Sequence, residues 1–143
     1  MQAQSGLRNK ENAMTFTTAL LAYGLMTLAL IGFEIMFTYA TKGFAYGFSS
    51  NRQAVDVTGF AMRVKRTLQN HIEAGAYGIP VLAVGAVMAV EGAGVELAAL
   101  LFVLGRGAFV LLYYTGIPFV RVPAFAMGTL SILYIAITLL TQA

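Results

Sequence analysis

The sequence has no cysteine, no tryptophan, only three prolines and a single histidine. Without cysteine the chain forms no disulfide and no thiolate metal site, and a reaction at sulfur would need a substrate that brings the sulfur. The histidine, His71, has no second histidine at the spacing of a zinc helix, so we expect no metal and predict a solvated or capping role for it. The chain also has no long basic face interleaved with aromatic residues, which argues against a nucleic-acid partner.

Charged residues are scarce as well. They make up 10% of the 143 residues, whereas 59% are hydrophobic and the mean hydropathy is +0.77. A soluble domain has about 25% charged residues. The composition therefore predicts an all-α membrane protein with one domain, whose helices pack on each other and face lipid.

Four apolar segments follow a polar arm at 1–13. We predict a four-helix transmembrane bundle over 14–142, with spans at about 14–40, 57–90, 95–115 and 122–141. The first span is too long for the apolar core of a signal peptide. The second would be about 50 Å long at 1.5 Å per residue. It exceeds the hydrocarbon thickness, so its start should stand at the boundary and Pro80 should bend it.

Basic residues gather on one side of the predicted spans. Four spans place both termini on the same side, and the two loops on the other side hold six of the basic residues. The positive-inside bias therefore predicts that 41–66 and 115–122 are cytoplasmic. Within the first of these, 41–56 reads as a loop held near the membrane interface by aromatic side chains, namely Phe44, Tyr46 and Phe48.

A polar stripe enters the second span. At 100° per residue, four side chains fall within a narrow arc of one helix: Arg63, Arg66, Asn70 and Glu73. Charged groups at this depth are costly against lipid, so the stripe predicts a binding face. The simpler alternative is that its basic residues are topology anchors.

The third span carries Arg106 at its middle and Tyr113 seven residues later, on the same face. A buried arginine needs a partner, and we predict a structural ion pair between Arg106 and either Glu73 or Glu34. Tyr113 would lie near the cytoplasmic boundary, where it also suits a simple interface anchor. Arg121 stands at the mouth of the fourth span.

Together these residues carry a resemblance. The pattern RxxRxxxNxxE entering a span, an arginine followed seven residues later by tyrosine, and GIPxxR before a last apolar helix is similar to the MAPEG family. That family comprises membrane-associated proteins in eicosanoid and glutathione metabolism, and the similarity covers about residues 15–142. It implies a homotrimer that holds glutathione, as co-substrate, between subunits on the cytoplasmic side.

The resemblance also implies roles for individual residues. It assigns catalysis to Arg121, which would stabilise the thiolate, and to Tyr113. It assigns glutathione binding to five residues: Arg63, Arg66, Asn70, Glu73 and Tyr113. Guanidinium groups suit the two carboxylates of glutathione, and a carboxylate suits its ammonium group.

Four positions depart from the family pattern: Gln69, Ala74, Phe109 and Val122. They argue more against eicosanoid synthesis than against generic thiol transfer. We therefore expect a glutathione-dependent transferase or peroxidase that acts on lipophilic electrophiles, in the inner membrane of a bacterium. One alternative is a non-catalytic subunit of a larger complex with the same bundle. Another is a small proton-coupled exporter, suggested by Glu34 in the first span.

Overall fold

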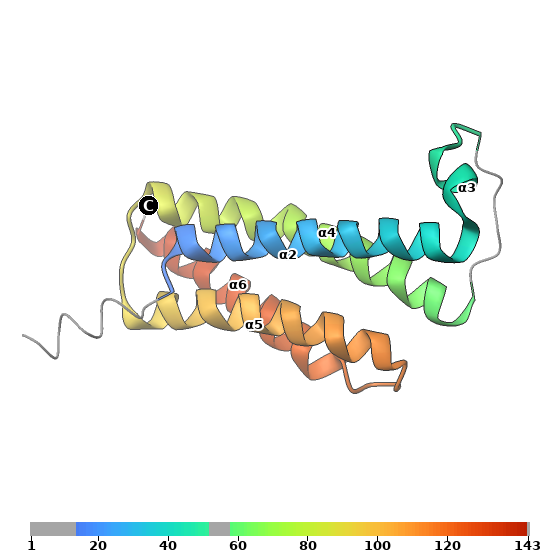
Figure 1. Ribbon diagram of the computed structural model, residues 1–143. Coiled ribbons are helices and arrows are strands. Elements are labelled where there is room, and N and C mark those ends of the chain that lie inside the picture. The colour runs from blue at the N-terminus through green and yellow to red at the C-terminus, as the bar shows by residue number, and fades with distance from the viewer. Residues whose placement is uncertain (1–13, 52–57, 143) are drawn as a thin grey trace, which may run out of the picture.

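The computed structural model describes residues 14–51 and 58–142, and all the regular structure in these ranges is helical. The elements are α2 (Phe16–Lys42), the short α3 (Phe44–Phe48), α4 (Gly59–Val87), α5 (Ala93–Thr115) and α6 (Val122–Gln142). The four long helices run alternately in opposite directions, so the start of α2 and the end of α6 lie at the same end of the bundle (Figure 1). The predicted all-helical fold class is confirmed.

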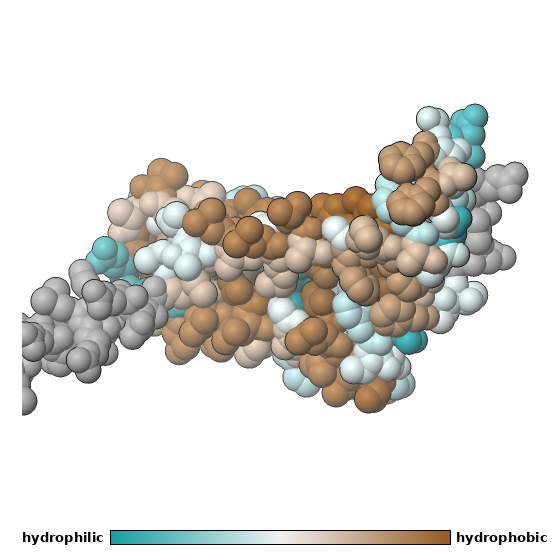
Figure 2. All heavy atoms as spheres, viewed as in Figure 1, coloured by the Kyte–Doolittle hydropathy of each residue, from teal (hydrophilic) through white to brown (hydrophobic). Residues whose placement is uncertain are grey.

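Three of these helices, α2, α5 and α6, are long and apolar enough to cross a membrane. Apolar side chains cover most of the bundle face seen in Figure 2, and hydrophilic ones gather mainly at its two ends. The protein is an integral membrane protein. The remaining long helix, α4, carries four charged residues between Arg63 and Glu73 and has Pro80 in its interior. That α4 is a fourth span stays a prediction.

Glycines allow the helices to approach closely. Helix α5 packs on α6, α2 packs on α4, and α4 also contacts α5 and α6. A Cβ atom on Gly105 of α5 would lie 2.8 Å from the backbone nitrogen of Gly128 on α6, and one on Gly78 of α4 would lie 2.6 Å from the Phe102 ring. The Gly105 contact fixes how α5 is seated against α6, because a backbone cannot move aside as a flexible side chain can.

His71 lies in the core and not in solvent. Its side chain is fully buried between α4 and α2, with its ring stacked on Tyr23 at 4.2 Å between centroids. His71 Nε2 lies 2.9 Å from Thr27 Oγ1, and the Tyr23 hydroxyl donates to the His71 carbonyl. The predicted solvated or capping role is therefore wrong. The polar stripe faces another direction on α4, and the fold turns the side of His71 toward α2.

The predicted loop at 41–56 is wrong in its first half, where Thr41 and Lys42 end α2 and Phe44–Phe48 form α3. Gly43, with φ of +80°, separates α3 from α2. Residues 52–57, among them Arg52, lie outside the described residues.

Candidate functional site

A polar pocket lies where α4 meets the last turns of α5. Its lining residues are Arg66, Gln69, Asn70 and Glu73 from α4 and Tyr113 from α5, around a cavity of about 360 Å³. The spacing of the α4 residues places them on one face of that helix. The volume lies within the range of about 300–1,000 Å³ found for small-molecule sites. The structure thus brings together four of the residues predicted to bind glutathione.

Gln69 orients the acidic wall of the polar pocket. Its Nε2 donates to Glu73 Oε1 at 3.0 Å, one turn further along α4. Sequence reasoning noted Gln69 only as a departure from the family pattern and missed this role. The i, i+4 spacing of Gln69 and Glu73 was the signal that could have found it.

Arg106 supports the pocket from beneath. It is only 1% exposed, although it lies in the middle of an apolar helix. Its Nη2 donates to Asn70 Oδ1 at 2.8 Å and to the Asn70 carbonyl at 3.1 Å. A guanidinium can only donate, so the side-chain oxygen of Asn70 must be the atom that faces it. The Asn70 amide NH₂ is consequently the group left for the pocket.

The contact with Asn70 takes the place expected for an ion pair. Among the described residues, neither Glu73 nor Glu34 is paired with Arg106, and Arg106 Nε and Nη1 have no hydrogen-bond partner. The guanidinium also stacks over the Phe109 ring, with its carbon 4.9 Å from the ring centroid. An aromatic ring face attracts a cation, so this contact adds to the stabilisation of the buried Arg106 charge.

Arg121 does not itself line the polar pocket but contacts Tyr113, which does. Its guanidinium carbon lies 4.2 Å from the centroid of the Tyr113 ring. Arg121 directly precedes α6, and its carbonyl accepts the hydrogen bond from Phe125 N that opens this helix. The residue that lies over the Tyr113 ring is thus also the one that directly precedes the positive end of the α6 dipole.

Two predicted residues lie elsewhere. Arg63 does not line the polar pocket: a Cβ on Gly116, at the end of α5, would meet Arg63 Nη1 at 2.9 Å, and the Arg63 guanidinium lies over the Phe60 ring. Glu34 lines a separate cavity of about 80 Å³ beneath α3, together with Thr38. Neither side chain contributes to the wall of the polar pocket.

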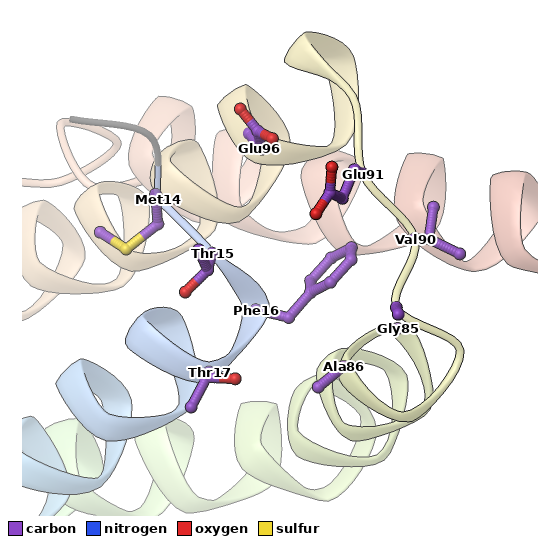
Figure 3. A pocket seen from close by; sticks show the side chains of 10 residues that line it. Met14, Thr15, Phe16, Thr17, Gly85, Ala86, Val90, Glu91 and Glu96 are labelled. Atoms are coloured by element: carbon purple, nitrogen blue, oxygen red, sulfur yellow. The ribbon is translucent and has the colours of Figure 1, made fainter. Parts of the chain in front are cut away.

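A second cavity, of about 220 Å³, lies at the opposite end of the bundle, between the start of α2 and the turn from α4 to α5 (Figure 3). The Phe16 ring and the carboxylates of Glu91 and Glu96 line it, and none of its lining residues in the described chain is basic. The two carboxylates would repel an anionic ligand. The polar pocket is therefore the better candidate for an anionic peptide.

The described residues contain no group of three or more acidic or histidine side chains placed to hold a metal ion. The helices and the site define an integral membrane protein with a charged, amide-lined pocket at one end of an apolar bundle. The family model of the MAPEG family matches residues 14–141, and the chain belongs to this family. The family includes glutathione transferases and also non-catalytic members. No curated protein and no solved structure matches the chain.

Proposed function

We propose that this protein is a glutathione-dependent transferase or peroxidase that acts on lipophilic electrophiles at the membrane. The observation that carries the proposal is the polar pocket itself, in which two ionised groups, two amides and a phenol meet at one end of an apolar bundle. Family membership supports glutathione as the co-substrate.

The donor and acceptor set of the pocket suits glutathione. The tripeptide offers two carboxylates, one ammonium group, two peptide groups and a thiol. Arg66 would hold a carboxylate, and Glu73, kept in place by Gln69, would hold the ammonium. The Asn70 NH₂, turned outward by Arg106, would donate to a carbonyl or carboxylate oxygen.

Arg121 is the residue we assign to thiol activation. A free thiol titrates near 8.5, and each unit of lowering needs about 1.4 kcal/mol of preference for the thiolate. A half-buried guanidinium beside the first turn of α6 supplies positive potential for that purpose. The thiolate sulfur then forms a bond to the electrophilic carbon as the leaving group departs with the bonding electrons, and the thiol proton goes to solvent.

We further propose that the site is completed in a homotrimer. All five lining residues come from α4 and α5, and Arg66 and Glu73 are exposed in the single chain. Charged side chains near the membrane need a polar surrounding, which a neighbouring subunit would provide. The 41–66 and 115–122 segments would face the cytoplasm of a bacterium, so glutathione would enter from there and the second substrate from the bilayer.

The experiment that tests the proposal is calorimetric titration of the purified protein with glutathione. We expect Arg66→Ala and Glu73→Ala each to weaken binding by about tenfold to a hundredfold, the loss of one hydrogen bond to a charged group. Lys65→Ala is the matched control, because Lys65 is an exposed cation on the same turn that does not line the pocket.

Unchanged affinity in both pocket variants would contradict the assignment. Turnover is then measured with an aryl halide that partitions into the membrane. Glutathione binding without conjugate formation would instead identify a non-catalytic member of the family. The mass of the protein in mild detergent, measured by light scattering, tests the trimer.

A further inference from the structure

The short helix α3 is held firmly against the end of α2. Gly47 of α3 lies so close to Tyr39 of α2 that a Cβ atom would come within 1.9 Å of the tyrosine ring. In the described chain α2 is the only element that α3 contacts, and α3 stands away from the bundle axis (Figure 1). Among the described residues, α2 therefore sets the position of α3.

The outward side of α3 is aromatic. Phe44 and Phe48 are 66% and 76% exposed. Their rings lie 5.1 and 5.5 Å from the Tyr39 ring and 6.5 Å from each other, so the three form one continuous aromatic patch. Figure 2 shows hydrophobic side chains projecting over α3 beside hydrophilic ones. A patch of this kind in open water would be unfavourable.

The length of α2 places this aromatic patch at the membrane surface. Its 27 residues span about 40 Å, whereas the hydrocarbon core is about 30 Å thick and the whole bilayer about 40–45 Å. If the first turn of α2 lies at one boundary, its last residue, Lys42, lies among the headgroups of the other leaflet. The Lys42 ammonium lies 4.8 Å from the Tyr46 ring centroid. Lysine next to aromatic rings is the composition typical of that zone.

We propose that α3 is a membrane-surface anchor. The aromatic patch of Tyr39, Phe44 and Phe48 lies at the boundary between headgroups and acyl chains of the bilayer that α2 crosses, with Lys42 directed to lipid phosphates. Two observations favour lipid over a second protein chain. The patch continues the exposed apolar surface of α2, and the Lys42 cation beside it complements a phosphate. This inference does not depend on glutathione binding.

The absence of tryptophan from the chain permits a direct test. Phe48→Trp introduces a single tryptophan at an exposed position, and Leu28→Trp places one at the middle of α2, where Leu28 is 66% exposed. Both variants are reconstituted into vesicles whose lipids carry bromine either just below the headgroup or near the end of the acyl chain. We expect the tryptophan at 48 to emit at short wavelength and to be quenched best by the shallow bromines, and the control at 28 by the deep ones.

The outcomes show whether the aromatic patch lies against lipid, water or protein. Long-wavelength emission without quenching at position 48 would place α3 in water and overturn the proposal. Short-wavelength emission that neither bromine position quenches would place the patch against protein, such as a second copy, and would overturn it as well.

The role of Lys42 has its own comparison in the Phe48→Trp background. Brominated anionic lipid should quench more effectively than brominated zwitterionic lipid. One lysine near the surface should enrich anionic lipid around it by about fivefold. Lys42→Gln should remove that preference. A preference that is absent before the change, or that survives it, would overturn the contact with phosphate.

Discussion

Replacing Asn70 with aspartate separates the two tasks that we assign to this side chain. Its oxygen accepts the hydrogen bond from the buried Arg106, and its NH₂ is left for the ligand. Aspartate keeps an acceptor for Arg106 but turns the donor of the pocket into a second acceptor. Alanine removes both groups, so the two variants predict different orders of stability and affinity.

The magnitudes follow from the contacts. Arg106 is 1% exposed, and losing the Asn70 Oδ1 acceptor in Asn70→Ala should cost about 1.5–3 kcal/mol, the value of a hydrogen bond to a charged group. Asn70→Asp keeps that bond and adds a countercharge. Repulsion between the new carboxylate and Glu73, three residues on, costs only about 0.2–0.5 kcal/mol. The aspartate variant should therefore unfold at or above the wild-type midpoint.

The glutathione affinities of the two variants should rank in the opposite order to their stabilities. An acceptor facing a carbonyl or carboxylate of glutathione is repulsive, so Asn70→Asp should bind about a hundredfold more weakly than wild type, and Asn70→Ala about tenfold more weakly. Thermal unfolding in detergent and calorimetric titration measure the two quantities on the same samples. The reasoning is refuted if aspartate destabilises as much as alanine, or if aspartate binds glutathione like the wild type.

Three further predictions concern single contacts. Gly105→Ala places a methyl group 2.8 Å from the α6 backbone and should cost about 1–3 kcal/mol in thermal unfolding, whereas Gly24→Ala, which meets open space, should cost nothing. His71→Leu should lower the unfolding midpoint, because about 1–2 kcal/mol of stacking and hydrogen bonding is lost. It should leave the glutathione affinity unchanged, and a change in affinity alone would place His71 in the site. Tyr113→Phe should weaken glutathione binding only a few-fold, because the ring beneath Arg121 remains. Tyr113→Leu removes that ring and should also lower kcat. Equal kcat in the two variants would exclude a role for the stacked ring.

Much of the fold and part of the site were predictable from local pattern. Apolar runs of sufficient length place the four long helices within a few residues of their observed bounds. The shared helix face of Arg66, Asn70 and Glu73 was predictable as well. Residues three, four and seven apart lie on one face of a helix wherever that helix lies. The family resemblance implied that they share one site with Tyr113, and in the structure these four residues line one cavity.

The contacts between helices could not be predicted from the sequence. The sequence pattern suggested a glutamate for Arg106, and the structure provides Asn70, because the partner depends on how far α5 is shifted along α4. The expectation of a solvated His71 was wrong because a helical pattern does not show which neighbouring helix covers the side of α4 that faces away from the polar stripe. The short α3 was missed since its position depends on a glycine meeting one tyrosine ring.

The sequence by itself determined that this chain is an integral membrane protein of apolar helices with a few polar side chains at fixed angular positions. Hydropathy and helical periodicity are local properties, so they survive any arrangement of the helices. Only the tertiary structure decided that Arg106 orients Asn70, that Arg121 rests on Tyr113, and that Arg63 and Glu34 lie outside the polar pocket. These facts depend on the relative shift of packed helices, which is set by close contacts such as that between Gly105 and Gly128.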